Sequence, residues 1–433
     1  MTTAAAPIDQ PRGPFANQWI QLIAGVICMA AVANYQYGWN FFVPAMQEAN
    51  GWSLASIQWA FTSFLTLEVW LVPIEGPLVD KYGPKLMIFL GGIFAALGWI
   101  INAHAPTVQM LWFGNAVAGV GAGLVYGTCI SNATKWFGAR RGLAAGLTSM
   151  GFGAGAALTV VPILHMIKVS GYGPTFQLFG IVQGVIVILA SFFFVMPPKT
   201  LAAAPKQTGL LQGTHDYTLR ETLASPVFWV MFVMFVLVAA GGLTAVGSLA
   251  TIAKDFYVDQ SPVTIFIWTQ LALAWTAQLN NIVNGATRPI LGALSDRIGR
   301  ENTMFFAFLV EGIGIWALWN YGRTPIAFVL LSGVVFFAWG EIYSIFPATC
   351  RDHFGQRNQT TNYGFLYQAK WVASFAVPGS ALLVATTHSW QVVLYITAAM
   401  NIVAAIMALV VLKPLRIWDV RRQQAAATGA AGS

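Results

Sequence analysis

The feature that most constrains this chain is a series of long apolar runs that recur along almost its whole length. A helix that crosses the hydrocarbon core of a bilayer needs about 20 predominantly apolar residues. The 433 residues are 57% hydrophobic and only 9% charged, whereas soluble proteins carry roughly 25% charged residues. The pattern therefore predicts an all-α protein that crosses a membrane many times.

Reading the apolar runs between polar breaks predicts twelve transmembrane helices. They cover residues 18–46, 56–79, 86–103, 108–133, 142–166, 173–196, 226–253, 263–294, 302–320, 324–350, 361–387 and 389–412. The only long polar segment inside the chain, residues 197–225, separates the first six from the last six. We therefore divide the chain into an N-terminal tail (1–17), an N-terminal six-helix half (18–196), a linker (197–225), a C-terminal six-helix half (226–412) and a C-terminal tail (413–433).

The distribution of basic residues predicts the orientation. Seventeen of the 22 Lys and Arg residues fall in the two tails, the linker and alternate loops, and three fall in the loops on the opposite side. By the positive-inside rule both termini face the cytoplasm, which agrees with an even number of spans. We expect a multi-pass protein of the cytoplasmic membrane of a bacterium. The net charge of +7 does not indicate nucleic acid, because the basic residues are spread over short loops and contact membrane lipid instead.

Two loops carry the same pattern, a glycine, an aspartate, a base and a second glycine, 216 residues apart. The residues are Gly76, Asp80, Lys81 and Gly83 after the second span, and Gly292, Asp296, Arg297 and Gly299 after the eighth. A repeat at this offset indicates duplication of a six-helix unit. The loops resemble the signature of the major facilitator transporters, and the resemblance implies the major facilitator fold, with these loops as cytoplasmic gate elements.

Two basic residues, Arg288 and Lys370, lie inside apolar spans. Each is eight residues from the cytoplasmic edge of its span, or about 12 Å along a helix, against a hydrocarbon half-thickness of about 15 Å. A cation at that depth is costly and marks a substrate or ion path by default. An arginine fork and a lysine point charge suit the two ends of a small dicarboxylate. The alternative is that each base only neutralises a buried acid.

The spans also contain acids. Glu341 lies beside the predicted site, and we consider it a partner for Arg288 when substrate is absent. Glu311 lies in the ninth span, where a structural hydrogen bond is the simpler interpretation. Glu68 is the candidate proton carrier, since burial disfavours the charged form of a carboxyl group. A proton-carrying glutamate suits a proton-coupled symporter as well as an exchanger.

Over nearly its whole length the chain resembles the oxalate/formate antiporter family. The matching stretches are Val79–Pro84, Gly123–Gly127, Arg141–Ala144, Asn284-Gly285, Arg288-Pro289, Phe337–Gly340, Phe346-Pro347, Asn362–Phe365 and Ala369-Lys370. The resemblance implies that Arg288 and Lys370 hold the dicarboxylate. It also implies an aromatic cage around the anion, formed by Tyr37, Tyr126, Trp339, Tyr343 and Tyr367. Tyr367 stands where we expect tryptophan in the family, and Glu68 stands where we expect an amide.

These observations predict a secondary transporter of small carboxylates that works by alternating access, with oxalate:formate exchange as the first hypothesis. The alternatives are a proton-coupled symporter of a monocarboxylate such as formate or lactate, and a carboxylate sensor that does not transport. We predict no enzymatic activity, since neither HExxH nor a nucleophile elbow occurs. We expect no cofactor and no metal site, because the three cysteines are scattered through apolar segments. The resemblance implies a monomer.

Overall fold

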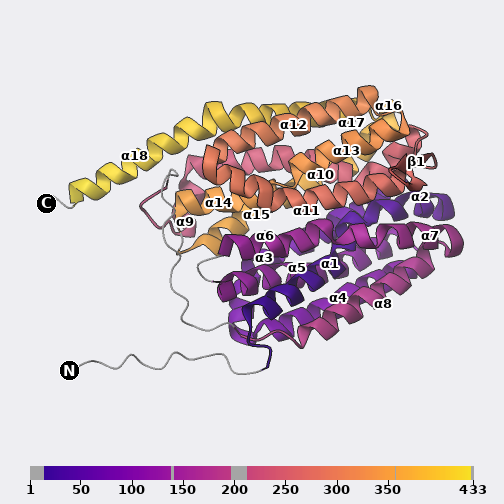
Figure 1. Cartoon of the computed structure of the whole chain (residues 1–433), viewed down its shortest axis with the longest axis horizontal. Coiled ribbons are helices and arrows are strands. Elements are labelled where there is room, and N and C mark those ends of the chain that lie inside the picture. Colours follow the sequence, from indigo (N-terminus) through magenta and orange to yellow (C-terminus); the bar gives the residue numbers. More distant parts are fainter. Residues whose placement is uncertain (1–13, 138–140, 197–211, 356, 431–433) are drawn as a thin grey trace.

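The structure, a computed structural model, describes residues 14–137, 141–196, 212–355 and 357–430. Six helical spans form the N-terminal half, which is drawn in indigo to magenta in Figure 1. They are α1 (Gln18–Tyr37) with α2 (Trp39–Asn50), α3 (Leu54–Tyr82), α4 (Pro84–Ala103), α5 (Val108–Phe137), α6 (Arg141–Ala154) with the 3-10 turn η2 (Gly155–Leu158) and α7 (Val160–Ser170), and α8 (Tyr172–Ser191).

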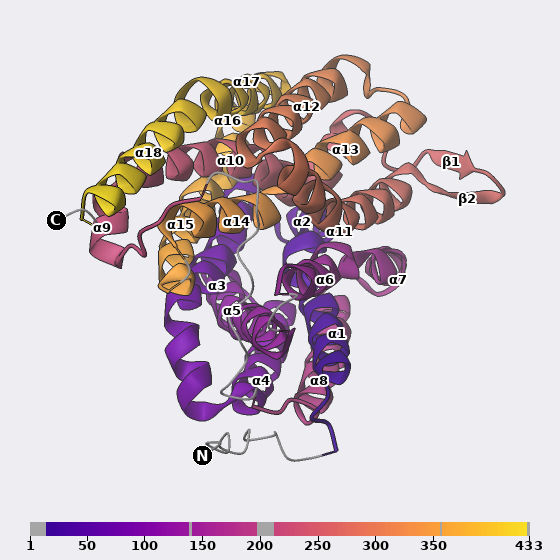
Figure 2. The ribbon, with the colours of Figure 1, turned by 60° about the vertical axis from the view of Figure 1, so that its left-hand side comes forward.

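The C-terminal half repeats this plan after the short helix α9 (Leu219–Ala224). Its elements are α10 (Pro226–Asp255), the strands β1 (Pro262–Ile265) and β2 (Trp268–Leu271), α11 (Ala272–Ile298), α12 (Arg300–Tyr321), α13 (Pro325–Trp339) with α14 (Ile342–Phe354), α15 (Gln359–Ser374) with α16 (Ala376–Thr387), and α17 (Gln391–Met407), which continues through the π-helical turn η3 (Ala408–Leu412) into α18 (Lys413–Ala430). Figure 2 shows the two halves as separate groups of helices that meet along one interface.

Among the described residues, eleven helical stretches are long and apolar enough to cross a membrane. Helix α11 is not one of them, because its buried side is polar and carries Asn280, Asn281, Asn284 and Arg288. Its 27 residues nevertheless extend about 40 Å at 1.5 Å per residue, which is enough to span a bilayer. With α11 the count agrees with the twelve helices predicted from the sequence.

The eighth span begins later than the sequence pattern predicts. Residues 262–271 form an antiparallel hairpin in which Val263 pairs with Gln270 and Ile265 pairs with Trp268. β-branched and aromatic residues dominate this stretch, and such residues favour strands. The indole of Trp275 donates a hydrogen bond to the Val263 carbonyl at 3.0 Å, so the hairpin is fastened to the start of α11.

The two halves touch near both ends of the bundle. Helix α3 packs against α15 and α16, α6 packs against α11, and α2 packs against α10. Near the end that carries the hairpin, Gln58 donates to the Gly247 carbonyl at 2.7 Å. Toward the end that carries α9, a Cβ atom on Gly364 would lie 3.3 Å from Pro73. These contacts close the centre of the interface from both sides.

Two spans break at the level of this centre. Gly38 ends α1 and begins α2, and a Cβ atom there would lie 2.8 Å from the Asn34 carbonyl oxygen. Gly340 ends α13, and a Cβ atom there would lie 2.6 Å from the Asn284 carbonyl oxygen. A larger residue at either position would push the neighbouring backbone away. Non-helical backbone at membrane depth is tolerated where it is buried in protein or lines a cavity.

The polar segment before α10 is tied to the C-terminal half. The Tyr217 hydroxyl donates to Asp419 of α18 at 3.1 Å, and Gln423 of α18 donates to the same hydroxyl at 3.0 Å. The side chains of Asn358 and Asn362 both donate to the Tyr217 carbonyl. Tyr217, Asn358, Asn362, Asp419 and Gln423 therefore form one cluster, which we call the Tyr217 latch.

Candidate anion-binding site

Arg288 lies on the buried side of α11 and is 1% exposed. Its Nη1 donates to the Ser149 carbonyl at 2.8 Å, and its Nη2 donates to the Tyr37 hydroxyl at 3.2 Å. The amide oxygen of Asn284 is a longer contact at 3.5 Å. Within the described chain Arg288 has no carboxylate partner, and its Nε is buried without an acceptor. Neutral oxygens therefore hold this guanidinium, and no carboxylate of the described residues neutralises its positive charge.

Lys370 lies on α15 with none of its surface exposed. Its Nζ is 2.9 and 2.7 Å from the two carboxylate oxygens of Glu68, on α3 of the other half. It also donates to Gln36 at 2.9 Å and to the Tyr367 hydroxyl at 3.2 Å. An ammonium has three protons, and four acceptors surround this one. The alternative of a base that neutralises a buried acid thus applies to Lys370, whereas Arg288 has no such acid.

The five aromatic residues that the resemblance placed around the anion lie together. The rings of Tyr37 and Trp339 are 6.3 Å apart, Trp339 and Tyr343 are 5.4 Å apart, and Tyr343 and Tyr367 are 6.2 Å apart. Tyr126 stacks on Tyr367 at 6.1 Å with an interplanar angle of 11°. These rings come from both halves, and we call them the aromatic cage.

Both cations face the cage. The guanidinium carbon of Arg288 lies 4.9 Å from the centre of the Tyr343 ring, and Nζ of Lys370 lies 5.7 Å from the same ring. Both positive groups therefore lie within 6 Å of the centre of one tyrosine ring. Cation–π contacts of this kind contribute about 0.5–2 kcal/mol each. The arrangement brings two cations from two different helices to the same aromatic cage.

Four further residues of the site are found in the structure and were not singled out from the sequence as site residues. Phe152 of α6 packs edge-on against Tyr37 at 5.6 Å and against Tyr126 at 5.2 Å. Gln36, Ser149 and Asn284 supply oxygens to the two cations. Asn284 was visible in a family-like stretch, but nothing in the sequence pattern distinguished Phe152, Gln36 or Ser149 from packing residues.

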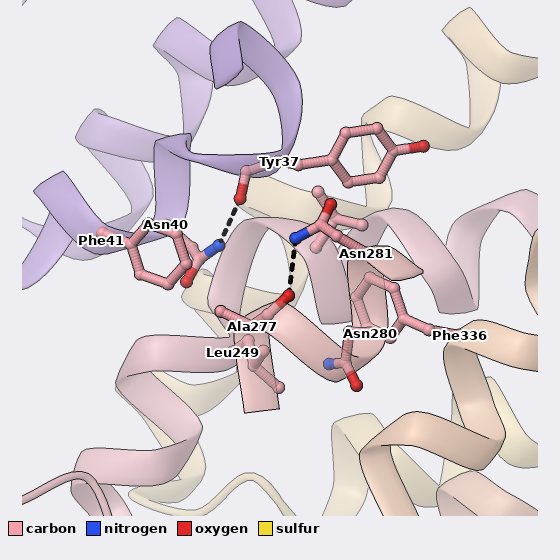
Figure 3. Close-up of a pocket in the computed structure, with 9 residues that line it drawn as sticks. Tyr37, Asn40, Phe41, Leu249, Ala277, Asn280, Asn281 and Phe336 are labelled. Atoms are coloured by element: carbon pink, nitrogen blue, oxygen red, sulfur yellow. Dashed lines mark hydrogen bonds between the residues drawn. The ribbon is translucent and has the colours of Figure 1, made fainter. Parts of the chain in front are cut away.

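A small pocket adjoins the cage between the two halves (Figure 3). It is lined by Tyr37, Asn40, Phe41, Val246, Leu249, Ala277, Asn280, Asn281 and Phe336. Asn40 donates to the Tyr37 carbonyl at 3.1 Å, while the Tyr37 ring points away from Asn40. Asn281 donates to the Ala277 carbonyl at 2.7 Å. The amide oxygens of all three asparagines, and the amide nitrogen of Asn280, are buried there without a hydrogen-bond partner among the described residues. The pocket is therefore a polar recess that shares Tyr37 with the cage.

The remaining acids do not join the two cations. Glu341 lies at the break between α13 and α14, fully buried, and neither of its oxygens has a hydrogen-bond partner. Among the described residues the structure shows no ion pair between Glu341 and Arg288; the guanidinium donates to Ser149 and Tyr37 instead. Glu311 on α12 and Glu75 on α3 are likewise buried, and neither forms an ion pair with a cation of the described residues.

The two repeated glycine–aspartate–base–glycine loops end their helices in the same way. Gly83 and Gly299 have φ of 83° and 95°, a region that favours glycine. Asp296 pairs with Arg300 at 2.7 Å, and Arg300 also binds Asp352 at 2.9 Å. Lys81 and Arg297 are exposed, and Gly292 lies close to Ser344. The surroundings of Gly76 and the side chain of Asp80 lie outside the described part of the chain.

Comparisons with known proteins agree with this architecture. The profile of the Major Facilitator Superfamily matches residues 23–268 and again residues 246–431. The chain is 31% identical over 401 residues to the "Oxalate:formate antiporter" of Oxalobacter formigenes, an alignment that covers 92% of each chain. It is 27% identical over 171 residues to "Monocarboxylate transporter 11" of Homo sapiens, which covers 38% of this chain and 36% of that protein. The crystal structure of the POT family transporter PepTSo has a TM-score of 0.66 at 14% identity and covers 94% of this chain and 99% of that chain, a likeness of fold alone.

Proposed function

Because the chain belongs to the Major Facilitator Superfamily and, within it, to the oxalate/formate antiporter family, we propose that it exchanges oxalate for formate by alternating access. A multi-pass membrane transporter without enzymatic activity is what the family assigns to it. The observation that carries the proposal is the pair of buried cations, Arg288 and Lys370, that face one aromatic cage between the two halves.

The chemistry of the two cations suits a small carboxylate. The guanidinium of Arg288 can replace its contacts to Tyr37 and Ser149 with a charge-assisted fork on one carboxylate, which is stronger than bonds to neutral oxygens. Lys370 can bind a second carboxylate as a point charge. The cage rings supply apolar walls that exclude water, and the low dielectric strengthens both attractions. A short dianion satisfies both cations at once.

The contacts between the halves suit alternating access. The α3–α15 and α6–α11 pairs run past the site, and the halves also meet near each end of the bundle. Rocking of one half against the other opens one end while the other stays closed, which is the motion that paired six-helix halves perform. We propose that the site residues move with their own halves, so that the substrate bridges the two.

The proposal also gives the protein's membrane and its orientation in that membrane. Helix α1 begins and α18 extends at the same end of the bundle (Figure 1). By the excess of Lys and Arg there, this end faces the cytoplasm of a bacterium. The gate motifs at Gly83 and Gly299 lie at that end, and we assign them to the cytoplasmic gate. We propose that the protein functions as a monomer, as the resemblance to its family implies.

A second candidate is proton-coupled symport of a monocarboxylate. It is favoured by the contact of Glu68 with Lys370, because the acid cancels one of the two positive charges and leaves a site that matches a monoanion. The partial similarity to a protein named as a monocarboxylate transporter points the same way.

Counterflow in proteoliposomes separates the two candidates. Vesicles that contain the purified protein are loaded with unlabelled formate, oxalate or lactate, and uptake of labelled oxalate is followed. We expect transient accumulation of oxalate only with internal formate or oxalate. Symport would be favoured instead if an inward proton gradient drove labelled formate or lactate into vesicles without internal substrate. The same uptake should then be unchanged in vesicles loaded with oxalate. The Arg288→Gln variant serves as the inactive control.

A further inference from the structure

The inference rests on the proposed function and concerns the charge that moves with each substrate. Three side chains around the cage carry charge, namely Arg288, Lys370 and Glu68. Their sum is one positive charge when the glutamate is ionised. Burial of net charge in a low dielectric is costly, so loaded forms that cross the membrane are favoured when their charges cancel.

Formate and oxalate meet this requirement in different ways. Formate has one negative charge, and with ionised Glu68 it cancels both cations. Oxalate has two negative charges, so with ionised Glu68 the loaded site is negative. It becomes neutral only when Glu68 is protonated.

We propose that Glu68 takes up one proton when a dicarboxylate binds and releases it when a monocarboxylate binds. The ion pair between Lys370 and Glu68 breaks, the lysine binds the substrate carboxylate, and an O–H bond forms on Glu68. The proton comes from water on the side where oxalate enters and leaves to water on the side where oxalate departs. Exchange of oxalate for formate then carries one proton along with oxalate and moves no net charge.

The contacts of Lys370 explain why the glutamate must respond. Glu68, Gln36 and Tyr367 already use all the protons of the ammonium. A substrate carboxylate on Lys370 therefore displaces one of them, and Glu68 is the one that it repels. The carboxylate of Glu68 contacts no second cation within the described residues. Once displaced it has no charged partner nearby, and a proton is what neutralises it.

The groups that face Glu68 leave it as the site of protonation. They are Lys370 and Tyr367 on α15, Tyr37 on α1, Tyr126 on α5, Tyr343 on α14 and Glu75 on α3 itself. Tyrosines ionise near pH 10 in water, so they do not exchange a proton at neutral pH. Within the described part of the chain Glu75 is the other carboxyl of this group; it lies about two helical turns along α3 and does not contact Lys370.

The test measures protons and charge in formate-loaded proteoliposomes that are given external oxalate. A pH dye inside reports protons, and valinomycin with a potassium gradient sets the membrane potential. For the native protein we expect about one proton inward per oxalate, about a tenfold change in oxalate accumulation per unit of pH gradient, and no effect of potential. For Glu68→Gln we expect no proton movement and a tenfold change in accumulation for each ~59 mV.

Two further variants keep the test decisive. Glu68→Asp retains a carboxyl group, and we expect it to keep the proton movement. Glu75→Gln removes the neighbouring buried acid, and its proton and charge readings should match those of the native protein. The proposal is overturned if native exchange responds to potential without moving protons, or if Glu68→Gln still moves protons. Absence of any carboxylate counterflow in the native protein would instead refute the proposed function.

Discussion

The site has two positively charged ends, at Arg288 and at Lys370, which we call the Arg288 pole and the Lys370 pole. They differ in the groups that accept hydrogen bonds from the cation. Around Arg288 the acceptors are a backbone carbonyl, a hydroxyl and an amide, all neutral. Around Lys370 one acceptor is a carboxylate that comes from the other half of the molecule. A substrate therefore adds a new ionic bond at the Arg288 pole and exchanges one ionic bond for another at the Lys370 pole. We infer that the Arg288 pole supplies most of the affinity and the Lys370 pole decides which charge is accepted.

The largest effect is expected at the Arg288 pole. Arg288→Gln removes the ionic bond that nothing else in the site can replace. Loss of a charge-assisted pair at a buried site costs about 2–5 kcal/mol or more, so oxalate uptake should fall by about 100-fold or more. Labelled oxalate counterflow measures this uptake. Near-native uptake by a well-expressed Arg288→Gln protein would show that Arg288 does not bind the substrate.

The second largest effect is expected at the Lys370 pole. Lys370→Gly should abolish oxalate transport and also destabilise the protein, because it leaves Glu68 buried without a cation. Removal of one partner of a buried pair costs about 3–5 kcal/mol. Thermal unfolding in detergent, together with oxalate uptake, reports both losses.

A double variant separates the two losses. In Lys370→Gln with Glu68→Gln the buried charge is gone, so the unfolding temperature should recover toward the native value. Oxalate transport should stay absent, while binding of formate at Arg288 should persist. If the double variant were as unstable as Lys370→Gly, the ion pair would not be what holds α3 and α15 together.

A smaller effect concerns return of the carrier without substrate. With Glu68 the three side chains sum to one positive charge, and Glu68→Gln raises this to two. We expect the ratio of net formate efflux to formate exchange to fall about tenfold in Glu68→Gln, which corresponds to about 1.4 kcal/mol in the return step. Efflux into substrate-free buffer and into formate buffer gives the ratio. An unchanged ratio would mean that the charge at Lys370 does not limit the return.

The smallest effect tests one neutral contact. Tyr37→Phe removes the hydroxyl that accepts from Arg288 at 3.2 Å and keeps the ring. A single hydrogen bond to a charged group is worth about 1.5–3 kcal/mol, and substrate offsets part of that loss because the arginine becomes freer to bind it. The KM for oxalate should therefore change only a few-fold. Tyr35→Phe, a buried tyrosine whose hydroxyl has no hydrogen-bond partner, is the matched control.

The fold could be predicted from the sequence for physical reasons. Apolar runs of membrane-spanning length and a repeat at constant offset indicate paired six-helix halves. The helical rise predicts that Arg288 and Lys370 lie near mid-membrane, and this stays a prediction. The aromatic residues came from resemblance, and the structure brings all five together.

Other features depended on packing that no local pattern encodes. Glu68 and Lys370 are 302 residues apart, and their contact exists only because α3 of one half packs on α15 of the other. The hairpin before α11 was read as helix, since a short apolar run does not distinguish a strand from a helix. The break at Gly340 belongs to the same class, because close approach to Asn284 of another helix defines it, whereas Gly38 contacts Asn34 of its own span.

The Tyr217 latch has a practical consequence for anyone who shortens or fuses this protein. Asp419 and Gln423 of α18 bind Tyr217, and Gln423 also accepts from the backbone amide of Thr214 at 3.0 Å. A truncation that ends before Asp419 would remove these hydrogen bonds and leave the segment held by Asn358 and Asn362 alone among these side chains. Reporter domains and affinity tags are better attached beyond α18, where they leave these hydrogen bonds intact.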